Sequence, residues 1–301
     1  MFNVDQKERY LKNVNESLKN FYCQIFNSMS FFEESAGKDI CNFTTEEIIQ
    51  WYKFLFTPSL ERLVNINSKM EDYQRWCLSE SLVNDGQNHF SEINLEILGA
   101  CINKTIISQS VISREVLLEK IKELINPRER FLLLGLFEGI GAKGNDNEEF
   151  LNAHFTDIVD NKIHLCTGRV IDISDDLKKI AKESNEQKAY YTATGQKKEL
   201  VGDTIIKDTV RLNSDSKNMG LKIYKLFSKS RDYIGLYNKT SMKKIMDSGV
   251  INYLNIKAKE YNMEVKQLLY EKDILEYLNN QYCYNKQSNL YFIKKYNDFL
   301  I

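Results

Sequence analysis

Apolar residues recur at near-helical spacing along most of this chain. Residues 6–30 carry one apolar stripe at a spacing close to 3.6, which predicts a single amphipathic helix. Thr44 followed three residues later by Glu47 is a capping-box pattern and predicts the start of another helix. A further helix is predicted to begin at Ser59 or Asn67. The first part of the chain therefore favours four or five helices.

The turn-forming tripeptide Asn84-Asp85-Gly86 ends this helical region. We predict the domain boundary in residues 84–92, which gives a first domain of residues 1–90 and a second of residues 91–301. Each domain is long enough to bury its own core. Only 2 Pro and 13 Gly occur in the chain, so we expect long helices and order nearly throughout.

The second domain continues with helical patterns. Ser113 is a predicted N-cap, and Asn126-Pro127 opens a helix over residues 128–139. That helix is apolar almost all round, so it belongs in the middle of a core. Further helices are predicted at about 217–230, 240–259, 262–280 and 286–300. The fold class is therefore mainly α.

Two segments of the second domain have a different pattern. Short β-rich runs at 162–165 and 169–173 flank Cys166-Thr167-Gly168, and this arrangement predicts a hairpin. Residues 187–220 are the least regular part and fit a strand pair or an extended loop equally well. A small antiparallel sheet therefore accompanies the helices.

Composition excludes several classes of protein. The six cysteines stand singly, without a CxxC or Cys/His spacing, so we expect neither a disulfide framework nor a metal site. The glycine-rich segment GIGAKGN (139–145) lacks the phosphate-loop pattern, and we expect no cofactor. No stretch approaches the roughly 20 apolar residues that span a bilayer, and the N-terminus does not resemble a signal peptide. We expect a cytoplasmic protein without membrane contact.

Charge is unevenly distributed along the chain. Residues 1–100 carry 15 Asp/Glu against 9 Lys/Arg, whereas residues 178–244 carry 16 Lys/Arg against 7 Asp/Glu. A local cationic excess suits a polyanionic partner, because each neutralised phosphate releases condensed counterions. A solvated face of mixed charge would give the same count. Charge alone therefore does not decide between these two interpretations.

Several segments resemble the tyrosine recombinase (phage integrase) family, in the family's order and over nearly the whole chain. They are CNFTTEEIIQWYKFL (41–55), PRERFLLLGLFEGIG (127–141), EEFLNAHFTDI (148–158), VIDISDDL (170–177) and MEVKQLLYEKDILEYL (263–278). The resemblance implies a mainly α, tyrosine recombinase-like fold. It implies a helical core-binding-like (SAM-like) N-terminal domain and a helical catalytic-like domain with a small antiparallel sheet, which together clamp duplex DNA.

The catalytic pattern of that family is missing here. The family uses two arginines, a hairpin lysine, two histidines (or His and Trp) and a nucleophilic tyrosine to stabilise and cleave a phosphodiester. The position of the first arginine holds Gly141 or Asp146, depending on the direction of counting. The hairpin lysine is replaced by the turn Thr167-Gly168, and the last histidine is replaced by Glu271. No histidine follows His164, so the His-x-x-Arg box is absent in any alignment. Only Tyr282 lies near its expected position, that of the nucleophile.

A recombinase plan without the chemistry implies a sequence-specific DNA-binding transcriptional repressor that occupies a double-stranded operator. More narrowly, the chain resembles the repressors of lysogeny of SP-beta-type phages, which implies that it silences lytic genes without cleaving strands. We expect phosphate or groove contacts from cations in the basic half and beside the lost catalytic boxes. These are Lys143, Lys197, Lys198, Arg211, Lys217, Arg231, Lys243 and Lys244.

Two other functions stay open from the sequence. The chain would be an enzyme if it were a divergent recombinase that uses Tyr282, or it would be an interaction protein whose acidic first domain binds another phage regulator. The aromatic-rich tail, residues 282–300, is expected to dock back in cis or onto a partner subunit of a homo-oligomer. The sequence does not choose between these two positions of the tail.

Overall fold

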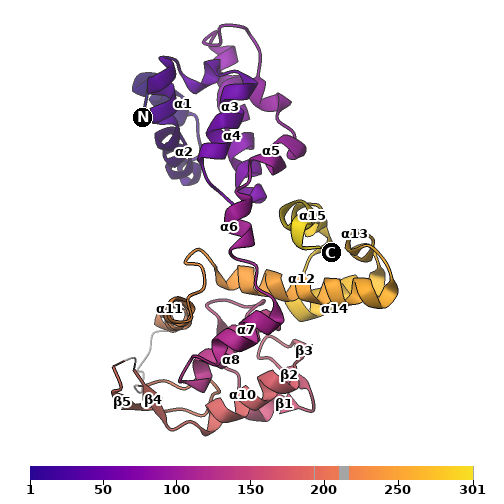
Figure 1. Ribbon diagram of the computed structural model, residues 1–301. Coiled ribbons are helices and arrows are strands. Elements are labelled where there is room, and N and C mark those ends of the chain that lie inside the picture. Colours follow the sequence, from indigo (N-terminus) through magenta and orange to yellow (C-terminus); the bar gives the residue numbers. More distant parts are fainter. Residues whose placement is uncertain (193, 210–216, 301) are drawn as a thin grey trace. The chain divides into compact units, whose positions relative to one another are not determined.

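The computed structural model describes residues 1–192, 194–209 and 217–300, except for the side chains of residues 217–219. The chain forms two compact units, Met1–Ile107 and Ser108–Ile301 (Figure 1). Each unit has its own core, as the sequence predicts for two domains.

The division between the units falls later than the predicted boundary at 84–92. Residues beyond the turn pack back on the first unit, because Phe90 is fully buried there. The N–H of Phe90 donates to Oε1 of Gln74 at 3.2 Å, and its carbonyl accepts from the amide of Asn67 at 3.2 Å. These contacts tie the segment after residue 84 to the preceding helix.

The first unit is helical, and its starts follow the local capping signals. It contains α1 (Val4–Lys12), α2 (Glu16–Ala36), α3 (Thr45–Phe54), α4 (Leu60–Ser79), α5 (Leu95–Cys101) and α6 (Lys104–Ser108), with 3-10 turns at Ile40–Asn42 and His89–Glu92. The predicted capping box is confirmed: Glu47 N donates to Thr44 Oγ1 at 3.4 Å, and Thr44 N donates to Glu47 Oε2 at 2.7 Å. Ser59 and not Asn67 caps α4, since its hydroxyl accepts from Arg62 N at 3.1 Å.

The predicted single helix over residues 6–30 is wrong, because the chain breaks between α1 and α2. Asn15 lies outside helical geometry, and its Oδ1 accepts from Ser17 N at 3.0 Å. A short polar side chain that binds nearby backbone starts a new helix in preference to continuing the old one. The apolar stripe survives the break, since Tyr10 and Tyr22 meet edge to face with centroids 5.3 Å apart.

The second unit is mainly helical and carries two small antiparallel sheets. Its helices are α7 (Arg114–Ile121), α8 (Pro127–Phe137), α9 (Glu148–Leu151), α10 (Asp175–Glu186), α11 (Lys217–Tyr233), α12 (Met242–Tyr261), α13 (Val265–Leu268), α14 (Lys272–Tyr282) and α15 (Asn289–Tyr296), with 3-10 turns at Phe155–Asp157, Lys286–Ser288 and Asn297–Phe299. Its strands are β1 (Ile158–Val159), β2 (Lys162–His164), β3 (Val170–Asp172), β4 (Ala189–Tyr191) and β5 (Lys197–Glu199). This confirms the predicted fold class.

The predicted hairpin is confirmed and is extended by one strand. Strands β2 and β3 pair antiparallel with Ile163 opposite Ile171, and β1 joins on the other side of β2. Gly168 adopts φ 80° in the connecting turn, a conformation that favours glycine. In the irregular segment 187–220, β4 and β5 form the second hairpin, so the strand-pair alternative holds for that part.

Helix α8 is the centre of the second core, as its all-round apolar pattern predicts. Residues from Arg128 to Phe137 are buried except Arg130, which is partly buried. Helices α7, α10, α11 and α12 pack against α8. Burial of this helix on several sides fixes the turn that follows it. The recombinase resemblance places the first catalytic arginine in this turn.

The C-terminal tail docks in cis within the second unit. Tyr296 donates its hydroxyl proton to Oδ2 of the buried Asp247 at 2.5 Å, and Phe292 packs edge to face on Tyr284 with centroids 5.4 Å apart. Of the helices described here, none combines the length and apolar character required to cross a bilayer.

Candidate nucleic-acid interface

The turn after α8 has no room for a catalytic side chain. Gly139 has φ 97°, and a Cβ added there would lie 2.0 Å from the carbonyl oxygen of Gln281. Gly141, which with Asp146 is one of the two expected positions of the first arginine, has φ 83°, and its Cβ would lie 2.8 Å from the ring of Phe150. Contacts below 3.0 Å require neighbouring atoms to move, and the positive φ values disfavour any L side chain. Close packing therefore excludes an arginine at position 141 in this backbone.

Arg169 lies beside this turn, and groups of the protein itself accept all the hydrogen bonds that its guanidinium donates. Its Nη1 donates to both carboxylate oxygens of the fully buried Glu149 at 2.8 and 2.9 Å. Its Nη2 donates to the carbonyls of Gly139 (3.1 Å) and Gln281 (2.6 Å), and its Nε donates to the carbonyl of Asn280 (3.2 Å). All three nitrogens are engaged, and Arg169 is only 6% exposed. This arginine holds segments together and offers no free donor to a phosphate.

Tyr282, the candidate nucleophile, is enclosed by two glycines. Its ring lies 3.2 Å from the place where a Cβ on Gly139 would be, and its hydroxyl lies 3.0 Å from the equivalent place on Gly249. Burial raises the pKa of Tyr282 well above 10. The nearby Tyr277 stacks on Tyr253 with ring centroids 4.3 Å apart. Burial raises the pKa of Tyr277 to about 12. A buried phenol that resists ionisation is a poor nucleophile.

The remaining catalytic positions also lack the family's groups. Thr167 in the hairpin turn donates its hydroxyl proton to Glu149 at 2.5 Å. Glu271 is exposed and precedes α14 without a side-chain cap. The histidines are held elsewhere: His89 pairs with Asp85 at 2.7 Å, and His154 and His164 lie near or on the first sheet. Within the described ranges, no three His, Cys, Asp or Glu side chains gather as metal ligands would.

Three of the predicted DNA contacts are exposed lysines of the second unit. Lys143 lies in the turn after α8, and Lys197 lies on β5. Lys243 lies in the first turn of α12; its side chain is 65% exposed although its ammonium is 3.1 Å from Asp247. Exposed lysines can reach a phosphate backbone, although Lys243 would have to exchange its contact with Asp247 for one with a phosphate.

Two other predicted contacts are already used inside the unit. Arg231 pairs with Asp232 at 2.7 Å and donates to the carbonyl of Thr240 at 3.3 Å. Lys244 donates to Ser110 Oγ at 2.8 Å and to the carbonyl of Lys239 at 3.1 Å, and burial lowers its pKa to about 8. Arg211 and the side chain of Lys217 lie outside the described residues.

Lys198 lies at a cleft that the sequence reasoning missed. Because successive strand residues point to opposite faces, Lys198 and Lys197 leave β5 in opposite directions. The cleft encloses about 300 Å³ between the β4–β5 hairpin, residues 206–209 and α11. We call it the basic cleft, after its lining by Arg128, Lys198, Lys207, Lys222, Lys225 and Lys229. Among the residues that the structure describes, Asp208 is the one acidic residue that lines it. Tyr190 lies among these cations.

Part of the basic cleft could have been found in the sequence. Lys222, Lys225 and Lys229 are three and four residues apart, so a helix places them on one face. Arg128 could not have been found in this way, since it belongs to a helix whose apolar pattern predicts a place in the hydrophobic core. The structure brings it out beside Tyr190, with the guanidinium carbon 4.2 Å from the ring centroid.

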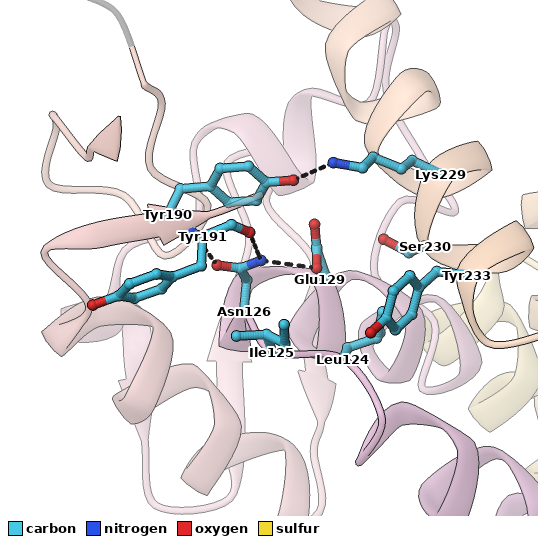
Figure 2. A pocket seen from close by; sticks show the side chains of 9 residues that line it. All are labelled: Leu124, Ile125, Asn126, Glu129, Tyr190, Tyr191, Lys229, Ser230 and Tyr233. Atoms are coloured by element: carbon cyan, nitrogen blue, oxygen red, sulfur yellow. Dashed lines mark hydrogen bonds between the residues drawn. The ribbon is translucent and has the colours of Figure 1, made fainter. Parts of the chain in front are cut away.

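The hairpin beside the cleft is fixed to the start of α8. Asn126 acts as a substitute strand partner: its amide donates to the Tyr191 carbonyl at 2.9 Å and its Oδ1 accepts from Tyr191 N at 2.9 Å (Figure 2). On the other side of Tyr190, Lys229 donates to its hydroxyl at 2.6 Å. These bonds hold Tyr190 between α8 and α11 and so fix one wall of the cleft.

Comparisons with known proteins find a solved structure and a prophage protein that are similar to this chain. A crystal structure described as a lambda integrase(75-356) dimer bound to a COC' core site matches with a TM-score of 0.42 and 16% identity, covering 93% of this chain and 96% of that chain. The SPbeta prophage-derived uncharacterized protein YopR of Bacillus subtilis (strain 168) is 25% identical over 142 residues. That match covers 47% of this chain and 43% of YopR, so it spans less than half of either protein.

Two family models cover most of the chain. The model of the MrpR N-terminal core-binding domain matches residues 1–79, and the model of the MrpR C-terminal catalytic domain matches residues 111–300. Each match falls inside one of the two compact units. The chain therefore belongs to the MrpR family.

Proposed function

We propose that this protein is a sequence-specific DNA-binding transcriptional repressor, which maintains a prophage by silencing lytic genes and does not cleave DNA. The burial of Tyr282 carries the second part of this proposal. A nucleophile must reach the scissile phosphorus, and the ring of Tyr282 lies between two backbone segments at Gly139 and Gly249.

Among the residues that the structure describes, the surroundings of Tyr282 supply no phosphate clamp either. Strand cleavage needs cations that stabilise charge on the phosphate and a group that protonates the leaving oxygen. Position 141 has no room for a side chain, and the donors of Arg169 are occupied by Glu149 and three carbonyls. A phosphate placed here would have to displace a fully formed buried network.

Binding without cleavage needs only a cationic surface that reaches phosphates and base edges. Lys143, Lys197 and Lys243 are exposed on the second unit, the part that matches the family's catalytic domain. Each lysine that neutralises one phosphate contributes a slope of about −0.9 to log K against log salt. A core-binding domain as the other half of the chain fits a protein that holds DNA with both units.

Recovery of bound fragments from the prophage genome tests the first part. We expect the full-length protein to retain a small set of fragments that share one sequence upstream of lytic genes. Lys197→Gln and Lys243→Gln should each flatten the salt slope by about 0.9, while Lys266→Gln, an exposed lysine on α13, should not. Failure to retain any duplex at low salt would instead favour a protein-binding role for the acidic first domain.

A further inference from the structure

We propose that the basic cleft binds a small ligand through its phosphate group, separately from DNA. This site goes beyond the proposed repressor function, and would make the second unit responsive to a phosphate monoester or a pyrophosphate. The inference starts from Arg128 and Tyr190, which form the inner part of the cleft.

Arg128 is a buried cation without a carboxylate partner. It is 9% exposed. The carboxylates of Glu129 and Asp208 favour its charged form from a distance, but within the described parts of the chain it forms no ion pair with either. Its Nη1 donates to the Lys207 carbonyl at 2.6 Å, and its buried Nε has no hydrogen-bond partner. Burying a charge that has no ion pair and one donor without a partner costs free energy, and the Tyr190 ring at 4.2 Å offsets that cost only in part. An anion in the cleft would offset that cost.

The other walls of the cleft add positive charge that is only partly neutralised. Lys222 pairs with Asp208 at 2.6 Å, and Asp208 is the only carboxylate that the described part of the chain places in the cleft lining. Lys225 and Lys198 are exposed, and neither has an ion pair or a side-chain hydrogen bond within the described chain. Lys229 is held by the Tyr190 hydroxyl at 2.6 Å. A doubly charged phosphate matches this excess better than a single carboxylate does.

The depth of Arg128 favours a small ligand over a duplex. A volume of about 300 Å³ lies at the lower end of the range for small-molecule sites. A phosphodiester within a duplex carries a sugar on both sides and lies on a convex backbone, so it meets exposed lysines first. A phosphate monoester or pyrophosphate has a free end that can enter a cleft and reach an arginine that is 9% exposed.

The cleft is built before any ligand arrives. Asn126 fixes β4 through two bonds of 2.9 Å to Tyr191, so the ring of Tyr190 stays next to Lys229 (Figure 2). On the segment that leads into residues 206–209, the Ile205 carbonyl accepts from Ser184 Oγ on α10 at 2.6 Å. Fixed walls lower the conformational entropy that a ligand would otherwise lose on binding.

Calorimetric titration of the full-length protein with inorganic pyrophosphate tests the proposal, at constant ionic strength in a buffer free of phosphate and sulfate. We expect saturable binding of one pyrophosphate per chain. Lys225→Gln should weaken it at least about fivefold, because one exposed cation of the site is removed. The matched control Lys179→Gln, an exposed lysine on α10, should change it less than twofold. Arg128→Met should abolish it in protein whose circular dichroism is unchanged.

A second set of measurements, made with duplex DNA, distinguishes this site from the proposed repressor function. Excess non-specific duplex should leave pyrophosphate affinity unchanged, and Lys225→Gln should leave duplex affinity within twofold of wild type. Absence of pyrophosphate binding at millimolar concentration, or equal weakening by Lys225→Gln and Lys179→Gln, would overturn the proposal. Competition by duplex would also overturn it, because the cleft would then belong to the DNA surface. None of these results depends on whether an operator is found.

Discussion

Replacing Arg169 by methionine should destabilise the second unit strongly, because this arginine serves the fold and not a substrate. Methionine retains much of the apolar stem but removes all five donors. Glu149 would keep its bonds from Gly141 N (2.7 Å) and Thr167 Oγ1 (2.5 Å) but would lose its only ion-pair partner among the described residues. A fully buried carboxylate without a cation is left behind.

The size of the effect follows from the groups left unpaired. Breaking one side of a buried ion pair costs about 3–5 kcal/mol, and each carbonyl that loses a buried donor adds roughly 1 kcal/mol or more. Three carbonyls lose a donor, those of Gly139, Asn280 and Gln281. Because contributions within one buried network do not add in full, we expect a total loss of about 4–6 kcal/mol for Arg169→Met. That is comparable with the whole stability of many domains.

Urea denaturation of the full chain measures this loss. Both tryptophans, Trp51 and Trp76, lie in the first unit, so fluorescence follows that unit while far-ultraviolet circular dichroism follows both. With a slope of roughly 2–3 kcal/mol per molar urea, the loss lowers the midpoint of the second unit by about 2 M. The fluorescence midpoint serves as the internal control and should move much less.

A double variant identifies the cause. Glu149→Gln removes the charge that Arg169→Met leaves unpaired, so the two changes together should cost roughly 2 kcal/mol less than the sum of the single changes. A loss below about 1 kcal/mol for Arg169→Met, or strict additivity in the double variant, would show that the Arg169–Glu149 pair contributes no more than an exposed ion pair does.

Two further predictions concern packing and pH. Gly139→Ala should lower the free energy of unfolding in urea by about 3 kcal/mol or more, since its Cβ would meet the Gln281 carbonyl at 2.0 Å. Gly168→Ala, whose Cβ would have nothing within 4 Å, should lower it by only about 1 kcal/mol. Equal losses for the two variants would contradict this. Burial lowers the pKa of Lys244 to about 8, so the unfolded chain binds more protons between pH 8 and 10.5 and the stability contribution of this lysine rises with pH across that window. The difference in melting temperature between wild type and Lys244→Met should therefore grow in favour of wild type from pH 8 to pH 10, and a constant difference would exclude the linkage.

Much of the fold could be predicted because its signals are local. The capping box at Thr44, the proline that opens α8 and the glycine turn at Gly168 each act within a few residues of their own position. The apolar pattern did not predict the break between α1 and α2, because a single local side chain overrides it. The apolar stripe continues across it, and one side chain, Asn15, decides the outcome.

For the candidate site, the sequence predicts only which residue types are present or absent, and not which side chains contact one another. The absence of histidine after His164 can be read directly from the sequence. The role of Arg169 cannot, because its partners Glu149 and Gln281 lie 20 and 112 residues away along the chain. Arg128 was hidden by its position in a core helix, and its unpaired state depends on which side chains the fold brings near it.

The most direct test of non-cleaving DNA binding uses a recovered operator fragment with a nick beside each candidate scissile position. In an active recombinase such a substrate traps the covalent phosphotyrosine adduct. We expect the protein to shift the fragment in a native gel and to release all of it, with no new strand break, under denaturing conditions. A denaturation-resistant adduct that disappears in Tyr282→Phe would contradict the account and establish strand cleavage.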